Sequence, residues 1–445
     1  MDNYNDISAT GAYLLAVLVA VAILADVRHD LTRLVSGRNV VLLAIGAWYL
    51  FEMVMLPAAL RSHTQEEFNL GVCYVGLAFL SFMLGYHYTS GCSLFLAMGK
   101  RISFFDDERW LWRIVLVGAL IGFAPIVYNT GTRVAEMFQG MMGQRATWGG
   151  LLGRGRYGDA RAAFLVLELF VGAVAPFAAI ILFDQRSKLV QRLFCFLVVV
   201  WPVLRGFGSG MRSSLIVAVG CSIAAVLYWR ASAVWRKGMI WAILFSTPLL
   251  YGIMAAIVAS RGSGAFSWEA RERAEGVGNE MFRELLFIIS KVPSCADYQY
   301  GYVYYVQLVN PIPRFLWPDK PTLDAGLLMA DLYGEVNARG EAHLTISPGL
   351  IGEMYLNFGV FGIMGLSFFG GWLVKGWDVI PKLFSDSLPV MMFYSGGLGA
   401  LFIMGRSFTM NMFYGLLGLV LLAWLIRSFN PNAVSASVHP AASVQ

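Results

Sequence analysis

The sequence predicts an all-α polytopic membrane protein with about eleven transmembrane helices and a large outer loop. The hydrophobic fraction is 58% and the charged fraction 14%, against about 45–50% and roughly 25% in soluble domains. Lipid must therefore be the solvent for most of this surface. The apolar stretches approach the roughly 20 residues that a helix needs to cross a bilayer. Alternating strand-sized segments are missing, which argues against an outer-membrane barrel.

Eleven apolar segments have the length and composition of membrane spans. Their centres lie near Val17, Ala47, Leu77, Leu120, Val174, Val199, Val219, Pro248, Gly365, Gly397 and Leu419. Tyr13–Ala25 is followed by further spans and by no small-residue cleavage site, so we interpret it as the first transmembrane helix and not as a removed signal peptide.

Cysteines and short motifs predict no cofactor and no metal. The five cysteines are scattered, which is more typical of packing than of disulfides or metal binding. Cys73, Cys195 and Cys221 lie in predicted helices, Cys92 in an inner loop and Cys295 in the long outer loop. A P-loop, an HExxH motif and a CxxC pair are absent. Gly206, Gly208 and Gly210 resemble a dinucleotide fingerprint but lack a βαβ context.

The distribution of basic residues predicts the orientation, because short cytoplasmic loops collect Lys and Arg. Basic residues cluster in alternate loops, which contain Arg28–Arg38, Lys100–Arg109, Arg186–Arg192, Arg230–Lys237 and Lys375–Lys382. We therefore expect the N-terminus outside and the C-terminus, from Arg427, inside. Residues 1–259 hold the first eight spans, 260–347 the large outer loop, 348–428 the last three spans and 429–445 a flexible cytoplasmic tail.

Arginine, unlike lysine, is frequent on the predicted outer side. The loop 129–162 contains five arginines and no lysine. Further outer arginines stand in predicted short turns, at Arg205, Arg212 and Arg406, and in the long loop, at Arg261 and Arg314 among others. A guanidinium binds phosphate or carboxylate oxygens in pairs, which an ammonium cannot do. The set therefore indicates a site for a diphosphate or an acidic glycan. Pairing with lipid headgroups or with neighbouring carboxylates is the alternative interpretation.

The long outer loop combines three features. Met281–Val292 is amphipathic and could lie in the membrane interface. Five tyrosines follow between Tyr298 and Tyr305, and they suit either an interfacial aromatic belt or a platform, including Tyr302, on which sugar rings stack. The segment NPIPRFLWPDKP contains four prolines, which exclude helix and inner strand and leave Arg314 and Lys320 on a rigid extended backbone.

Two ionisable residues near the ninth span are candidate proton acceptors, His343 and Glu353. Ser347 and Pro348 suit the N-cap and first position of a helix, which puts Glu353 on its first two turns. A structural carboxylate is the alternative for Glu353. Glu52 and Glu168 fall within predicted spans, and such acids also suit an ion-coupled transporter, although no inverted repeat supports that class.

Three segments together resemble the oligosaccharide repeat-unit polymerases, the O-antigen polymerase (Wzy-type) family. They are GSGMRSSLI, IPRFLWPDKP and SPGLIGEMYLNFGVFG, and Arg406 between the last two spans also fits. The resemblance covers roughly residues 205–410. It implies a GT-C-like glycosyltransferase in the bacterial inner membrane that transfers a growing glycan from undecaprenyl diphosphate to a new lipid-linked repeat unit at the periplasmic face.

The resemblance also implies partners and roles. Donor and acceptor would be undecaprenyl-diphosphate-linked oligosaccharides, in the company of membrane lipid, a flippase and a chain-length regulator protein, with no nucleic acid. Arginines and Lys320 would stabilise the departing diphosphate, and His343 or Glu353 would accept the proton of the attacking hydroxyl. An O-antigen ligase and a flippase or transporter of the same lipid-linked sugar remain the alternatives.

Overall fold

The computed structural model describes residues 7–130, 167–209, 281–334 and 346–408, with short gaps at 29, 56–59, 61–62, 104–107, 185, 310–311, 313–315 and 322–324. Residues 238, 418, 420 and 421 are described singly. Every regular element in this part of the chain is a helix. The predicted all-α fold is confirmed to that extent.

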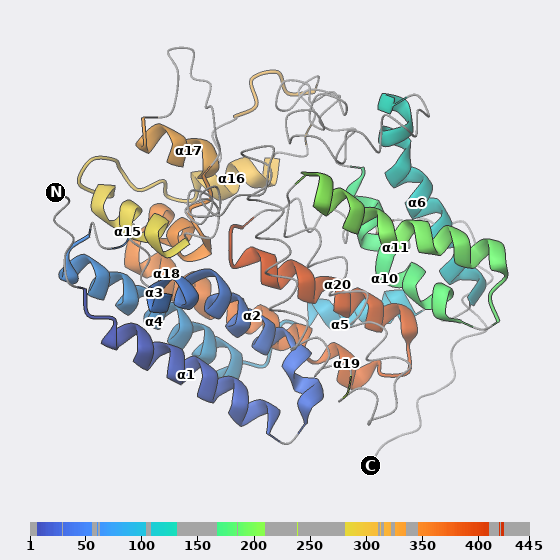
Figure 1. Ribbon diagram of the computed structural model, residues 1–445, viewed down its shortest axis with the longest axis horizontal. Helices are drawn as coiled ribbons and strands as arrows, with labels where there is room; N and C mark the ends of the chain where they lie inside the picture. The colour runs from blue at the N-terminus through green and yellow to red at the C-terminus, as the bar shows by residue number, and fades with distance from the viewer. Residues whose placement is uncertain are drawn as a thin grey trace, which may run out of the picture.

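The main bundle is built on two long helices, α4 (Gln65–Tyr88) and α18 (Leu350–Trp377). They pack against each other over most of their length, with α1 (Thr10–Val27) and α2 (Gly37–Ile45) beside them (Figure 1). At Gly85 and Gly371 a side chain would collide with the backbone of the facing helix. These glycines therefore permit the close helix contact that small residues provide in membrane bundles.

The second helix of the bundle is continuous but irregular. After α2 the chain passes through a π-helical turn, η2 (Gly46–Leu50), into α3 (Phe51–Met55). A π turn inserts an extra residue and rotates the side chains that follow it. Here the turn contains Trp48 and Tyr49, and both side chains are buried among other helices.

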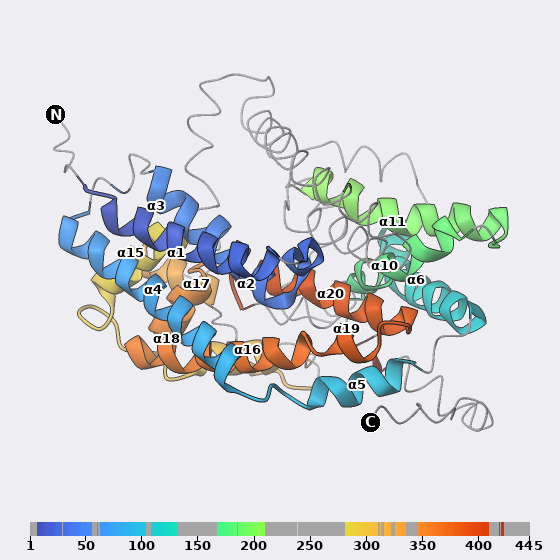
Figure 2. The ribbon, with the colours of Figure 1, turned by 90° about the horizontal axis from the view of Figure 1, so that it is seen from below.

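Three short helices of the predicted outer loop cap one end of this bundle. They are α15 (Met281–Lys291), α16 (Tyr302–Val309) and α17 (Ala325–Leu332). At the other end lie α5 (Leu94–Ile102) and α19 (Ile380–Leu383) (Figures 1 and 2). The helix over Met281–Val292 is confirmed, but its apolar side is buried against α4 and α18, with Phe282 and Leu285 fully enclosed.

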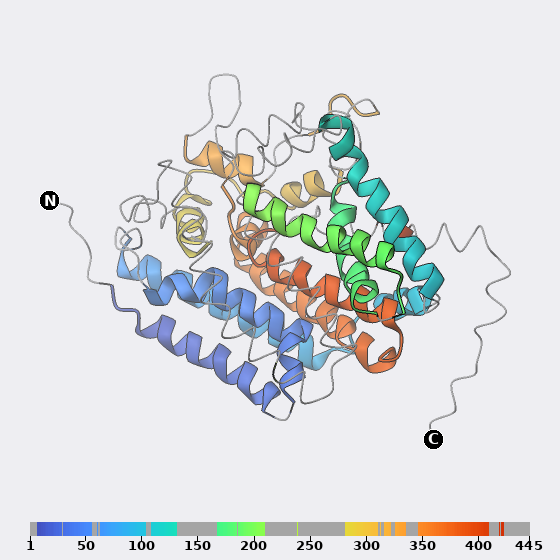
Figure 3. The same ribbon diagram turned by 45° about the vertical axis from the view of Figure 1, so that its right-hand side comes forward.

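A second group of helices packs beside the main bundle. It consists of α6 (Glu108–Thr130), α10 (Leu169–Phe183) and α11 (Leu189–Ser209), which share one hydrophobic core (Figure 3). Met392 of α20 (Leu388–Met404) belongs to the same core, so α20 joins this group to the main bundle. Each of α6, α10 and α11 contains one proline, which neighbouring helices tolerate in membrane bundles.

Four helical stretches among the described residues are long and apolar enough to cross a membrane: Thr10–Val27, Gly37–Met55, Gln65–Tyr88 and Leu350–Leu383. They contain the predicted centres near Val17, Ala47, Leu77 and Gly365. The centres near Leu120, Val174, Val199 and Gly397 lie on shorter apolar helices. Those near Val219, Pro248 and Leu419 lie outside the described residues. The described residues therefore contain four candidate spans, far fewer than the eleven predicted. Several long apolar helices of this kind indicate a membrane protein.

One helix boundary corrects the sequence prediction. The sequence predicts Arg205 in a short turn, but α11 continues to Ser209 and includes it. The glycines at 206 and 208 do not end the helix. Arg205 therefore lies on the last turns of α11.

Helix α18 is broken at Gly359, whose φ of 61° and ψ of −147° are not helical. The loop before α16 docks at this break. The amides of Gln299 and Tyr300 donate to the carbonyls of Leu356 and Asn357 over 3.0 and 2.9 Å. The side-chain oxygen of Asn357 accepts from the amide of Gly301 over 3.0 Å. The carbonyls that the break would leave without partners are thus bonded by the loop.

Candidate functional site

Two groups of buried polar residues surround carboxylates at the two ends of α18. One group surrounds Glu353 near the start of α18, and the other surrounds Asp378 at its end. Both carboxylates are buried, with exposed fractions of 1% and 7%. Buried ionisable groups in membrane helices are costly and mark structural or functional sites. We call these two groups the Glu353 cluster and the Asp378 network.

The Glu353 cluster begins with the unusual start of α18. Gly349, the residue before the helix, has a φ of 74°, and a side chain there would collide with the hydroxyl of Tyr49. That hydroxyl accepts a hydrogen bond from the amide of Ile351 over 2.9 Å. The π turn in the second span therefore positions Tyr49 to hold one of the free amides of the first turn of α18.

Glu353 binds the turn that follows α20. Its Oε1 accepts from the hydroxyl of Ser407 over 2.5 Å, and its Oε2 accepts from the amide of Phe408 over 2.9 Å. Hydrogen bonds to an ionised carboxylate are roughly twice as strong as neutral ones. The side chain thus joins the start of α18 to residues more than fifty positions later in the chain.

Two further hydrogen bonds fix the same turn. The hydroxyl of Ser347 donates to the carbonyl of Arg406 over 2.8 Å, and the amide of Leu350 donates to the carbonyl of Gly405 over 3.3 Å. The sequence predicts Ser347 as the N-cap of the helix. It instead binds the turn, because the helix begins later, at Leu350. Arg406 itself is half-buried, and its backbone is held on both sides.

Helix α16 closes the cluster. The ring of Tyr304 meets that of Phe408 edge to face, with centroids 5.4 Å apart. Its hydroxyl is buried and has no hydrogen-bond partner within the described part of the chain. Burial raises the pKa of the Tyr304 phenol, and the nearby Glu353 carboxylate raises it further, so the group remains a proton donor at neutral pH. Tyr302 and Tyr305 of the same helix are exposed, by 40% and 44%.

A second acid lies on the neighbouring span. Glu52 of α3 is 6% exposed, and its Oε2 accepts from the amide of Phe282 at the start of α15 over 2.9 Å. On α15, Glu284 accepts from the hydroxyl of Tyr333 over 2.8 Å. Glu52 thus attaches α15 to the bundle, and Glu284 links α15 to the end of α17. Glu168, the other predicted intramembrane acid, is buried just before α10.

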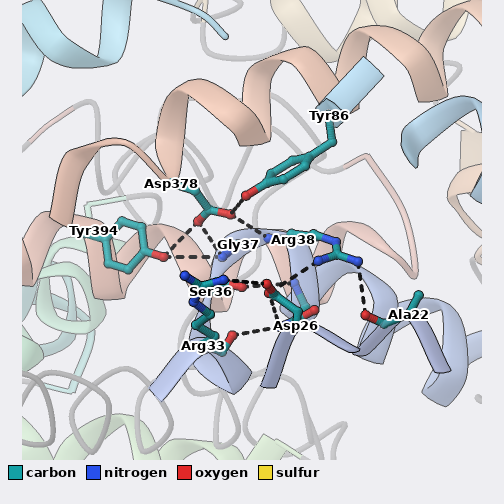
Figure 4. A network of polar contacts seen from close by, with 10 residues as sticks. Ala22, Asp26, Arg33, Ser36, Gly37, Arg38, Tyr86, Asp378 and Tyr394 are labelled. Atoms are coloured by element: carbon teal, nitrogen blue, oxygen red, sulfur yellow. Dashed lines mark hydrogen bonds and ion pairs between the residues drawn. The ribbon is translucent and has the colours of Figure 1, made fainter. Parts of the chain in front are cut away.

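The Asp378 network has a different composition (Figure 4). Oδ1 of Asp378 accepts from the amide of Gly37 over 2.6 Å and from the hydroxyl of Tyr394 over 2.8 Å. Oδ2 accepts from the amide of Arg38 and the hydroxyl of Tyr86, each over 3.0 Å. The Arg38 guanidinium pairs with Asp26 over 3.3 Å. Five helices, α1, α2, α4, α18 and α20, are thereby joined at this end.

The structure brings some of the predicted site residues together. Glu353 and Arg406 meet at one turn, and α16, with Tyr302, packs beside it through Tyr304. Lys320 is 4% exposed, and its ammonium donates to the carbonyl of Ile312 over 2.9 Å, so it braces the proline segment. For Arg205 only the helical backbone is described. Arg212, Arg261, Arg314 and His343 lie outside the described residues.

Several residues of the site are absent from the sequence prediction. Tyr49, Ser407 and Tyr304 depend on contacts between distant segments, and local pattern does not reveal them. Asn357 carried a usable signal, since it is a buried polar residue within an apolar helix. No group of three His, Cys, Asp or Glu side chains suited to a metal ion occurs in the described ranges. The four cysteines described there, Cys73, Cys92, Cys195 and Cys295, are free.

Comparison with known proteins gives one match. Residues 279–431 match the family model named Domain of unknown function (DUF8712). No activity is attached to that family. The matched range contains α15 to α20, and with them Glu353, Arg406 and the capping helices. No curated protein and no solved structure matches the chain.

Proposed function

We propose that the protein polymerises lipid-linked oligosaccharide repeat units at the periplasmic face of a bacterial inner membrane. A growing glycan leaves undecaprenyl diphosphate and is joined to a hydroxyl of a second lipid-linked repeat unit. The observation that carries the proposal is the Glu353 cluster. It unites an arginine-bearing turn, a buried carboxylate and a tyrosine-bearing helix at one end of an apolar bundle.

The proposed topology places eleven spans with the N-terminus outside and a GT-C-like architecture. Contacts among the described helices support a two-ended arrangement, since basic segments with Arg33, Arg38 and Lys375 lie at the Asp378 end and α15 to α17 at the other. Reporter fusions after Ser90 and after Val309 test the assignment. A periplasmic-only reporter active at the first position contradicts it.

The chemistry proposed follows from the bond that breaks. The anomeric carbon separates from a diphosphate, so stabilisation of the leaving charge is the main catalytic demand. Arg406, Arg212, Arg314, Arg205 and Arg261 are the proposed cations. A proton passes from the attacking hydroxyl to His343 or Glu353, through an oxocarbenium-like state at carbon. Tyr302 and Tyr305 present exposed rings on which a sugar can stack.

The test is glycan profiling of a strain lacking this chain, complemented with wild type or with Arg406→Ala, Arg314→Ala or Arg212→Ala at matched expression. The proposal expects single repeat units in the null strain and a ladder only with wild type. Full-length glycan that accumulates on the carrier lipid in the null strain would identify a ligase. Accumulation of units on the inner leaflet would identify a flippase.

A further inference from the structure

We infer that Glu353 is a positioning residue for Arg406 and is not the base of the reaction. The inference rests on the proposed function, in which Arg406 stabilises the departing diphosphate. It narrows the choice between the two candidate proton acceptors, Glu353 and His343, to His343.

The first argument is the burial of the Glu353 carboxylate and its use. The residue is 1% exposed. One oxygen accepts from the Ser407 hydroxyl over 2.5 Å and the other from the Phe408 amide over 2.9 Å. A general base instead needs a lone pair within hydrogen-bond reach of the substrate proton, and both oxygens here face a fixed turn.

The second argument is the position of the turn. Gly405 to Phe408 follow α20 directly, and Arg406 lies one residue before Ser407. Ser347 binds the carbonyl of Arg406 over 2.8 Å, and Leu350 binds that of Gly405 over 3.3 Å. On the other side, Trp48 packs where a side chain at Gly405 would stand and donates from Nε1 to the carbonyl of Phe402 over 3.0 Å.

As a consequence, every residue of the turn is held by a hydrogen bond, through the backbone at Gly405, Arg406 and Phe408 and through the hydroxyl at Ser407. Donors aimed at developing charge act best when they need no reorganisation during the reaction. A small displacement of a positioned group costs about 10²-fold in rate. Glu353 accepts two of the hydrogen bonds that hold the turn and thus helps to fix the backbone that carries Arg406.

The experiment measures polymerisation of lipid-linked repeat units in membranes of the native host, with the full chain present as wild type, Glu353→Gln, Ser407→Ala, Arg406→Ala and the corresponding double variants. In Glu353→Gln the remaining side-chain oxygen can still accept from the Ser407 hydroxyl. The NH₂ group that replaces the other oxygen cannot accept from the Phe408 amide. Ser407→Ala removes one bond and leaves the carboxylate. Ser385→Ala, in the exposed turn before α20, is the matched control for serine loss.

Positioning predicts that Glu353→Gln and Ser407→Ala each slow polymerisation by about 5- to 50-fold, with the pH profile of the wild type retained. In the Arg406→Ala background neither substitution has a further effect, because interacting residues are not additive. Ser385→Ala is unchanged. Melting temperatures in detergent show whether each variant is folded. If Glu353→Gln fails to fold, the rate and pH profile of Ser407→Ala test the positioning role instead.

A base predicts the opposite pattern. Glu353→Gln would then abolish activity by about 10²-fold or more, lose one limb of the pH profile, and keep this effect in the Arg406→Ala background, while Ser407→Ala changes little. That outcome overturns the inference and leaves the polymerase proposal standing. Normal glycan ladders in the null strain overturn the proposed function itself, whatever the variants do.

Discussion

The Asp378 network and the Glu353 cluster lie at the two ends of the same helix, α18, and use a buried carboxylate differently. Asp378 accepts from two amides and two phenols of three other helices. Glu353 accepts from a single short turn, next to a buried phenol that has no partner in the described residues. The first arrangement is complete as it stands. The second leaves hydrogen-bonding capacity beside an arginine.

The difference indicates that the Asp378 end of the bundle is structural. Asp378 joins the first turn of α2 to α4 and α20. The ion pair between Asp26 and Arg38 adds α1 to this network. Every donor around Asp378 comes from the framework of the bundle. At the Glu353 end, the framework residue Tyr49 and the capping helices surround a turn that carries a cation. Substitutions should therefore damage folding at one end and glycan transfer at the other.

The largest expected effect is on stability, at Asp378. Asp378→Ala leaves the amides of Gly37 and Arg38 and the hydroxyls of Tyr86 and Tyr394 buried without their acceptor. An unsatisfied buried group costs about 1–3 kcal/mol, so we expect a loss of about 3 kcal/mol or more and little folded protein. Yield and melting temperature in detergent measure it. Asp386→Ala, in an exposed turn, is the control; equal melting temperatures for the two variants would contradict the role of the network.

The next effect is expected at the start of α18. Gly349→Ala places a side chain at a φ of 74° and against the hydroxyl of Tyr49. A non-glycine residue at this φ and at the accompanying ψ of 152° costs on the order of 1–3 kcal/mol, and the collision adds to it. We expect a lower melting temperature and a shortened glycan ladder, since the amide of Ile351 moves with the turn.

The control for that variant is Gly365→Ala, at an open position on the same helix. If Gly365→Ala lowers the melting temperature as much as Gly349→Ala, the special geometry at the start of α18 is not the cause.

A smaller effect on stability, with a clear effect on glycan, is expected at the exposed rings of α16. Tyr302→Ala removes a side chain that is 40% exposed, and surface substitutions usually stay within about 0.5 kcal/mol. The ladder should nevertheless shorten, because a stacking surface is lost. Leu308→Ala, which truncates an exposed apolar side chain of the same helix, tests whether the loss of any apolar side chain there shortens the ladder. A glycan ladder of normal length in the Tyr302→Ala strain would favour the alternative interpretation, in which these tyrosines form an interfacial aromatic belt.

The smallest effect on stability is expected at Tyr304. Tyr304→Phe removes a buried hydroxyl that makes no hydrogen bond in the described part of the chain, so the melting temperature should stay the same or rise slightly. If the hydroxyl meets a substrate, the polymerisation rate falls while the melting temperature does not. A marked drop in melting temperature would show that the hydroxyl has a structural partner.

The sequence predicted the features that depend on composition and charge pattern. The apolar helices, the helix from Met281 and the position of Glu353 near the start of α18 follow from local signals, and the described residues agree with them. It failed where distant segments decide. The glycines after Arg205 predict a turn, but α11 continues through them to Ser209. Tyr49 could not be found, because a π turn has no sequence signature.

The candidate site could be predicted in part for the same reason. The sequence singles out Arg406 and Glu353 separately, as a cation and as an acid, without any indication that they share a turn. It predicts that Lys320 faces a diphosphate, whereas the ammonium is bonded to the carbonyl of Ile312. Proline spacing predicts a rigid segment but not which direction its side chains take.

The break in α18 at Gly359 affects how deep Glu353 lies in a lipid bilayer. The regular part of the helix beyond it, residues 360–377, rises by about 27 Å at 1.5 Å per residue, close to the roughly 30 Å of the hydrocarbon layer. The first turns, with Glu353, then stand above that layer, at the level of the phosphates and glycerol groups. In the proposed function, Glu353 would therefore lie at the height at which the polyprenyl chain of the substrate meets its diphosphate.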